Sequence, residues 1–176
     1  MVFLKQIINT IFLLALIQCM FSCSFTNSRV IHSNTFNKEL LNIKGVYYCE
    51  FDWGYHLQFI YKNGVVLSMA GNSDKSQTLD LQFRQIVKGW KESKYQENRY
   101  LWGAVEVANG GIFINRWQAG GLGPTYIKTE KGKILSKESF VIFSISGNEL
   151  EKYETYKFHP YSPKPDSTNS FIEDLE

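Results

Sequence analysis

From Lys44 onward the chain is a succession of short runs of aromatic and β-branched residues, with turn signals about every 8 to 12 residues. This spacing is typical of β-sandwiches and β-barrels. Short hairpins between consecutive strands favour an up-and-down meander, and closing a meander removes its unpaired edges. The sequence therefore predicts a mostly β protein, a small antiparallel up-and-down barrel of about eight strands, at 45–51, 55–62, 65–70, 100–107, 111–117, 125–135, 140–146 and 150–158.

Glycines mark the expected turns. Asn63-Gly64 predicts a type I′ hairpin, whose two central residues both need positive φ. Asn109-Gly110-Gly111 and Gly147-Asn148 mark two later turns, and Gly132 inside the sixth run predicts a bulge or a break. The glycine-rich stretch 120–124 lacks the Lys-Ser/Thr ending of a phosphate loop and precedes a strand, so we interpret it as a flexible loop at the barrel mouth.

One helix is expected between the third and fourth strands. Apolar residues recur there at near-helical spacing within 77–92, namely Leu79, Phe83, Ile86, Val87 and Trp90. We expect this short amphipathic helix to cap one end of the barrel or to cover a sheet face. A strand over Leu79, Leu81 and Phe83 is the alternative, because a period of two also fits those residues.

The amino terminus has the layout of an export signal: Lys5, an apolar run from Ile7 to Ile17, and a polar boundary. The run is shorter than the roughly 20 residues that a membrane-spanning helix needs. Ser22-Cys23 resembles the lipobox of bacterial lipoproteins, and this resemblance implies cleavage after residue 22 and acylation of Cys23. Cys19 is the alternative anchor, although the bulky Gln18 precedes it, and an ordinary secretory signal is a third reading.

We divide the chain into a lipoprotein signal peptide (1–22), a flexible tether rich in Ser, Asn and Thr (23–43), a barrel domain (44–159) and a C-terminal tail (160–176). Three prolines open the tail, which we expect at the surface. If Cys23 is lipidated, Cys49 remains as a free thiol, and a small buried residue is its expected role. With Cys19 as the anchor, Cys23 and Cys49 could form a disulfide.

The first expected strand carries a family resemblance. Ile43-Lys44-Gly45-Val46-Tyr47 resembles a relaxed form of the Gly-x-Trp start of lipocalins, with Tyr47 in place of tryptophan. With the 57–64 hairpin, Trp102-Gly103, the run 132–135 followed by Phe140, and Tyr156-Lys157-Phe158, residues 43–159 resemble the lipocalin-like lipoproteins of bacterial cell envelopes. Arg116 is a candidate for the later arginine motif of that family. The resemblance implies a membrane-anchored envelope protein, at the outer membrane, with a barrel around a small ligand.

Aromatic residues are abundant, with 13 Phe, 10 Tyr and 4 Trp. A barrel lined by Tyr47, Phe51, Leu57 and Phe59 would offer an apolar pocket with polar tips, so the leading hypothesis is a carrier of a small, mainly apolar ligand. The same side chains could instead fill the interior. The alternative is then a structural or protein-interaction barrel that uses exposed faces around Trp53, Trp90 and Trp117.

Enzymatic and cofactor chemistry find little support in the sequence. Glu50, Asp52 and His56 could do acid/base work, but polar residues at a hairpin are expected to face water, so we predict no enzyme. The three histidines lie far apart, which predicts no metal site, and no cofactor motif is present. The net charge of +2 is dispersed, which argues against nucleic-acid binding. The sequence leaves the oligomeric state open.

Overall fold

The computed structural model describes residues 30–31, 39–72, 74, 76–120 and 123–173. The predicted anchor Cys23 and its alternative Cys19 lie outside the described residues.

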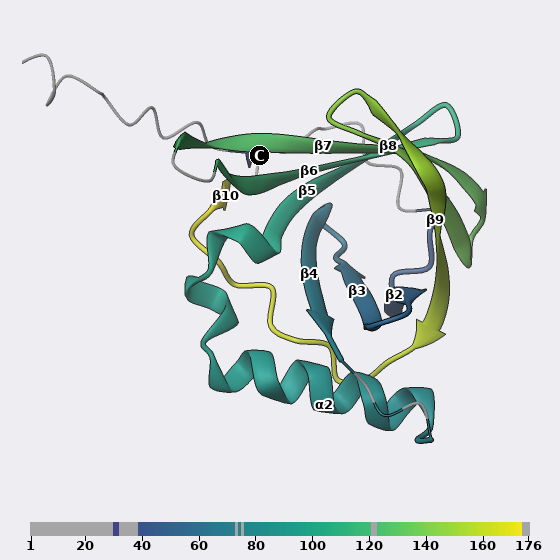
Figure 1. The fold of residues 1–176 in the computed structure, drawn as a ribbon, viewed down its shortest axis with the longest axis vertical. Helices are drawn as coiled ribbons and strands as arrows, with labels where there is room; N and C mark the ends of the chain where they lie inside the picture. Colours follow the sequence, from purple (N-terminus) through teal and green to yellow (C-terminus); the bar gives the residue numbers. More distant parts are fainter. Residues whose placement is uncertain (1–29, 32–38, 73, 75, 121–122, 174–176) are drawn as a thin grey trace, which may run out of the picture.

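Eight antiparallel strands form a closed barrel (Figure 1). Each strand pairs with the next along the chain, and the last pairs back to the first. The fold prediction is therefore confirmed. The strands are β2 (Gly45–Phe51), β3 (Gly54–Ile60), β4 (Val65–Gly71), β5 (Trp102–Ala108), β6 (Gly111–Gly120), β7 (Gly123–Ser136), β8 (Ser139–Ile145) and β9 (Asn148–Pro160).

Helix α2 (Leu79–Glu92) covers the outer face of one side of the barrel, beside β4 in Figure 1. Its Phe83 ring lies 5.2 Å from Tyr48 and 5.5 Å from Tyr55, centroid to centroid. The predicted helix is confirmed, and the alternative strand over its first residues does not form. Two short 3₁₀ turns follow, η1 (Tyr95–Glu97) and η2 (Arg99–Leu101), so β5 begins two residues later than expected.

The turns follow the glycine signals with one correction. At Asn63-Gly64 only Gly64 has positive φ (77°), so the hairpin forms but the type I′ prediction is wrong. Asn109 and Gly110 both have positive φ, as do Ser146 and Gly147. In the glycine-rich stretch Gly120 pairs with Gly123, and residues 121–122 lie outside the described residues. A register shift does occur between Lys131 and Gly132, but the extra residue is Phe143 of the partner strand β8, and β7 itself continues through Gly132.

Two apolar clusters divide along the strand faces. Alternate residues point to opposite faces of a strand, and residues directly opposite share a face. The interior cluster draws on strands from all sides of the barrel and includes Tyr47, Cys49, Ile60, Val66, Val105, Ile112, Ile114, Phe140, Ile142 and Tyr156. The outer cluster lies beneath α2 and includes Val46, Tyr55, Leu57, Phe59, Leu67, Met69, Phe83 and Trp102.

The segment after β9 packs against the barrel. Lys164 Nζ donates to the carbonyls of Ile43 and Ile60, at 3.1 and 2.6 Å, and lies 4.3 Å from the centre of the Tyr61 ring. Tyr61 Oη donates to the Pro165 carbonyl at 2.8 Å. The segment then ends in β10 (Ile172–Glu173), which pairs in parallel with β1 (Val30–Ile31). The C-terminal tail is thus part of the folded body.

Candidate functional site: a cleft and a buried polar cluster

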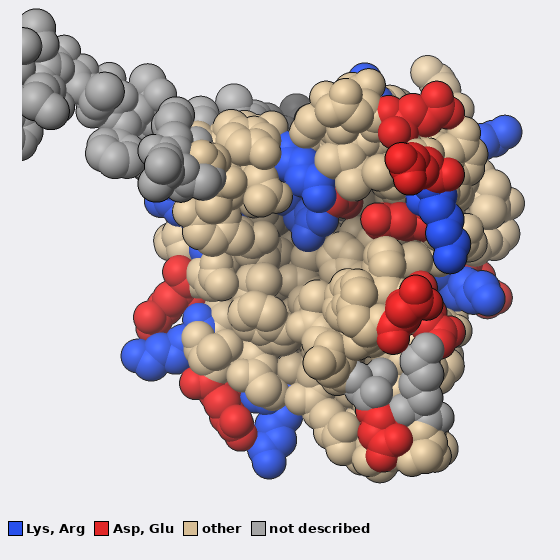
Figure 2. All heavy atoms as spheres, viewed as in Figure 1, with Lys and Arg blue, Asp and Glu red and all other residues tan. Residues whose placement is uncertain are grey.

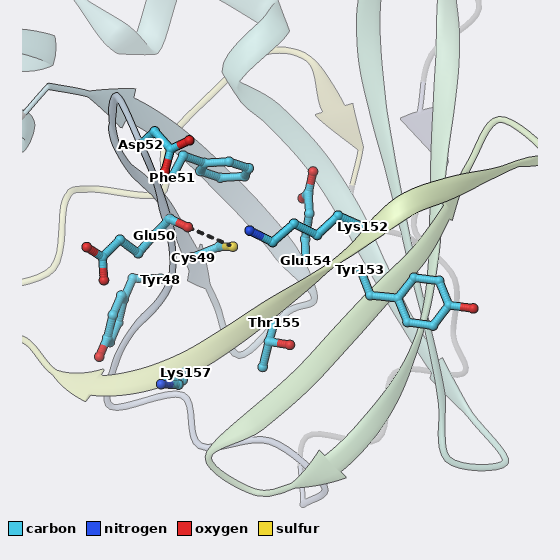
Figure 3. A pocket seen from close by; sticks show the side chains of 10 residues that line it. All are labelled: Tyr48, Cys49, Glu50, Phe51, Asp52, Lys152, Tyr153, Glu154, Thr155 and Lys157. Carbon is cyan, nitrogen blue, oxygen red and sulfur yellow. Dashed lines mark hydrogen bonds between the residues drawn. The ribbon is translucent and has the colours of Figure 1, made fainter.

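The barrel opens at its closing seam. Strands β2 and β9 pair only over Gly45–Tyr48 and Lys157–Pro160, and a cleft of about 470 Å³ separates them beyond that point. In the β8–β9 ladder, Ile142 pairs with Glu154 and Ser144 with Glu149, so residues 150–153 oppose a single residue of β8. Such a bulge bends the strand that carries it, which accounts for the divergence of β9 from β2. Figure 3 shows the lining side chains, Tyr48, Cys49, Glu50, Phe51, Asp52, Lys152, Tyr153, Glu154, Thr155 and Lys157.

Cys49 and Phe51 reach the cleft from the interior face of β2. Cys49 is buried and forms no disulfide within the described part of the chain, and its burial, with the nearby Glu154 carboxylate, raises the pKa of its thiol to about 11. The expected small buried cysteine is confirmed. Phe51 stacks on Trp53, with ring centres 5.1 Å apart and planes 10° from parallel. Trp53 is half-exposed, so this aromatic pair forms an apolar lip.

Behind the cleft lies a group of polar side chains that we call the interior polar cluster: His56, Gln58, Ser68, Arg116, Lys128, Glu130, Glu154 and Tyr156. Glu154 joins it to the cleft, since its Oε2 accepts from Tyr156 Oη at 3.0 Å. The same hydroxyl lies 2.6 Å from His56 Nδ1. Because Tyr156 has one proton to donate, His56 Nδ1–H is the donor in that second bond.

Glu130 is the fixed negative charge of the cluster. Its Oε1 contacts both Arg116 Nη2 and Lys128 Nζ, the latter at 3.3 Å. Burial alone would raise the pKa of Glu130, but the two cations outweigh burial and hold it below its usual value. Burial lowers the pKa of His56 to about 3, helped by Arg116, so the imidazole is neutral. Burial raises the pKa of Glu154.

Several buried polar atoms of the cluster have no hydrogen-bond partner among the described residues: Gln58 Oε1 and Nε2, Ser68 Oγ, Arg116 Nε and Glu130 Oε2. Gln58 is 0% exposed, and Ser68 and Glu130 are each 2% exposed. Buried polar atoms in native proteins are nearly always paired, so each exception calls for an explanation. Five such atoms in one cluster are the most unusual feature of this barrel.

Strand register brings these groups to one wall of the interior. Gln58 is directly opposite Ser68, and Arg116 is directly opposite Gly103. A Cβ atom on Gly103 would lie 2.5 Å from Arg116 Cγ and 3.2 Å from Val66 Cγ1. The missing side chain of Gly103 therefore leaves room for the Arg116 stem beside β5, while the guanidinium group contacts Glu130 of β7.

The structure separates the four residues expected to line a ligand site. Tyr47 and Phe51 face the interior, whereas Leu57 and Phe59 lie in the outer cluster beneath α2 and the C-terminal segment. Gln58 pairs with Tyr47, so its neighbours at 57 and 59 must point the other way. Tyr47 Oη donates to the Lys137 carbonyl at 2.7 Å and accepts from Asn42 N–H at 2.8 Å, which fixes the Tyr47 ring.

The residues of the enzyme hypothesis are also separated. His56 pairs with Cys49, so it faces the interior, while Glu50 pairs with Tyr55 on the outer face and Asp52 lies in the turn. Within the described ranges, no three His, Cys, Asp or Glu side chains come together in a way that could hold a metal ion.

The three tryptophans proposed as an interaction surface have different surroundings. Trp53 is 50% exposed. Trp117 is buried, and Trp90 packs partly on the outer cluster and donates to the Ala70 carbonyl at 2.9 Å. A continuous exposed surface made of all three is therefore not present. Figure 2 shows basic and acidic side chains intermixed on the face viewed there.

The interior polar cluster is not among the sites predicted from the sequence, although a signal for it is present. Arg116 follows Ile112 and Ile114 at inward-facing parity, and Gln58 stands between His56 and Ile60 in the same way. A polar residue at a position where the strand pattern predicts an apolar one indicates either a locally destabilised position or a functional site.

No protein-family description, curated protein or solved structure matches this chain. In the described part of the chain no helix is long and apolar enough to cross a membrane. The cleft and the interior polar cluster are therefore the features of this chain that bear on its function.

Proposed function

We propose that this protein is a lipid-anchored protein of the bacterial cell envelope whose barrel binds a small molecule through the β2–β9 cleft. The anchor rests on the lipobox-like Ser22-Cys23. The envelope location rests on the same residues and on the lipocalin-like pattern of residues 43–159. Binding rests on the geometry of the barrel, an architecture that commonly encloses one small ligand.

The observation that carries the proposal is the set of unpartnered polar atoms behind an open cleft. Each buried donor or acceptor without a partner costs about 1 to 3 kcal/mol. A protein that needed only a stable barrel would be better served by apolar residues there. A ligand that enters through the cleft would supply the missing partners, and apolar walls with a few convergent polar groups are typical of small-molecule sites.

Native mass spectrometry of the full chain, extracted from its own host, tests this proposal. We expect a co-purifying small molecule with the natural sequence and with Cys49→Ala, which keeps the cleft open. We expect its loss with Cys49→Phe, because Cys49 lines the cleft and a phenyl ring would fill its inner end. Failure to find any bound molecule after mild extraction, in all three proteins, would contradict the binding proposal.

Fatty-acid labelling in the same host tests the anchor separately. Cys23→Ala is expected to abolish labelling, and Cys19→Ala to leave the lipid in place. Labelling that survives Cys23→Ala and disappears in Cys19→Ala would move the anchor to Cys19. Absence of labelling with the natural sequence would show that the chain is not a lipoprotein, and labelling that persists in both variants would show that neither cysteine alone is the attachment site.

A second candidate function is a structural or protein-interaction barrel. It is favoured by the dense packing of the apolar part of the interior, where Ile112, Ile114, Phe140 and Ile142 are fully buried. Under this alternative the interior is closed and the exposed Trp53 lip is a contact surface. The native mass spectrum separates the two functions, because only the first one requires a small bound molecule.

A further inference from the structure

The interior polar cluster has an excess of positive charge. Arg116 and Lys128 share a single carboxylate oxygen of Glu130. His56 adds no charge, since burial holds its pKa near 3, and Glu154, whose pKa burial raises, accepts from the Tyr156 hydroxyl and forms no ion pair with either cation. Two cations against one fixed anion leave about one positive charge in a poorly solvated interior, where an unbalanced charge is costly.

Hydrogen-bond donors are available beside that charge. Arg116 Nε, Gln58 Nε2 and the Ser68 hydroxyl have no acceptor among the described residues. The Arg116 stem lies beside Gly103 of β5, which pairs with Val66 of β4. Ser68 is two residues further along β4 on the same face, directly opposite Gln58. Three donors on the interior faces of nearby strands, one of them on a guanidinium group, suit a small planar anion.

The net charge of the interior polar cluster favours an anion with a single negative charge. A carboxylate carries one negative charge and would balance the cluster, whereas a phosphate group carries up to two. Glu130 Oε2 is unpartnered in the same cluster, and it would repel a second negative charge. An amine ligand is disfavoured, because Glu130 already contacts two cations.

The side chains between the interior polar cluster and solvent are suited to an apolar ligand body. Between the cluster and solvent, Cys49 and Phe51 line the inner part of the cleft, and Trp53 stacks on Phe51 at its lip. Figure 3 shows Phe51, Cys49 and Glu154 lying around the same opening. A molecule whose anionic end reaches the cluster would leave its other end against these side chains.

From these observations we infer that the ligand is an organic anion with a single carboxylate group, held by Arg116, Gln58 and Ser68, and an apolar body that lies in the β2–β9 cleft. This inference rests on the proposed function and names the ligand class of the same site. No natural ligand needs to be known in order to test it, because simple probes share the chemistry.

The probes are octanoate and octan-1-ol, which have the same chain length and differ in the charged group. Binding is measured by isothermal titration calorimetry to the full chain in lipid nanodiscs, with empty nanodiscs as the control for partitioning. We expect octanoate to bind about 10-fold or more tightly than octanol, since a hydrogen-bonded charge pair is worth at least that factor. This comparison needs no variant, so it does not depend on the folding of a mutant.

Variants then test whether Arg116 and Gln58 bind the carboxylate group of octanoate. Arg116→Gln is expected to reduce octanoate binding to the level of octanol, and Gln58→Met to weaken it roughly fivefold. Neither change should alter octanol binding. The matched controls are Arg84→Gln and Gln82→Met, which change the same residue types on α2, and both should leave octanoate binding unchanged.

Two outcomes overturn the inference in different ways. Equal binding of octanoate and octanol, insensitive to Arg116→Gln, would refute carboxylate recognition and leave the barrel as a binder of uncharged apolar molecules. Absence of binding for both probes, together with a native mass spectrum free of any small molecule, would refute ligand binding itself and the inference with it.

Discussion

Replacement of Gln58 tests whether the unpartnered polar atoms of the interior polar cluster lower the stability of the ligand-free protein. Its side chain is 0% exposed, and both its amide nitrogen and its amide oxygen lack partners. Methionine has nearly the same length and volume but no strong donor or acceptor. Gln58→Met should therefore remove the cost of two unpaired atoms without leaving a cavity.

The size of the effect follows from the usual cost of such atoms. One unpaired buried group costs about 1 to 3 kcal/mol, and part of this is lost to imperfect packing of the new side chain. We expect the free energy of unfolding of the ligand-free protein to rise by about 2 kcal/mol, which corresponds to an increase in Tm of roughly 4 to 8 °C for a domain of this size.

The assay is thermal and urea unfolding of the full chain followed by circular dichroism. Gln82→Met is the matched control: Gln82 is also buried and its Oε1 is unpartnered, but its Nε2 donates to the Gln77 carbonyl at 2.7 Å. The control should change stability little, because the loss of one hydrogen bond offsets the removal of one unpaired atom. A change in stability for Gln58→Met no more favourable than that of the control would show that Gln58 is satisfied in the free protein, and the reasoning would fail.

Three further perturbations test other parts of the structure. Gly103→Ala should cost about 1 to 3 kcal/mol in unfolding free energy, since its Cβ would collide with the backbone oxygen of Asn115 and with Arg116 Cγ. Gly89→Ala, in open space on α2, should stabilise by up to about 1 kcal/mol, and equal effects in urea unfolding would contradict this account of Gly103. Stability should decrease as the pH falls from about 6.5 towards 3, because the His56 pKa is about 3 in the folded state and the unfolded state binds the proton more tightly in that window. The Tm of His56→Gln should depend less on pH there, and an unchanged profile would exclude His56 as a cause. Cys49 should react with iodoacetamide at pH 8 far more slowly than it does in urea, since burial raises its pKa to about 11; equal rates, measured by mass spectrometry, would place the thiol in solvent.

The strand count and the closed meander could be predicted because turn residues punctuate the sequence. The direction of the side chains could not, and β3 shows why. Six of its seven residues are buried, so its two faces cannot be distinguished by an alternation of apolar and polar residues. Both faces are buried because α2 and the C-terminal segment cover the outside, a tertiary contact that no local pattern encodes. Leu57 and Phe59 were therefore assigned to the interior, although they pack outward.

The cleft was beyond sequence reasoning for a related reason. Residues 150–153 contain no glycine or proline, so the sequence does not predict an irregular strand there. The bulge arises from the register between β8 and β9, which is fixed by inward packing of Ile142, Ile145 and Leu150. Arg116 was noted only as a possible family motif residue, and its ion pair with Glu130 depends on the β6–β7 register.

The parallel pairing of β1 with β10 has a geometric consequence for a protein held by a lipid. Val30 of β1 is joined to Ile172 of β10, and both short strands lie beside β5. If Cys23 carries the lipid, only residues 24–29 separate it from this attachment point, a span of about 25 Å at most even when fully extended. The barrel would then lie close to the bilayer with its β5 side towards the lipid, so the anchor would set the orientation of the barrel as well as its cellular location.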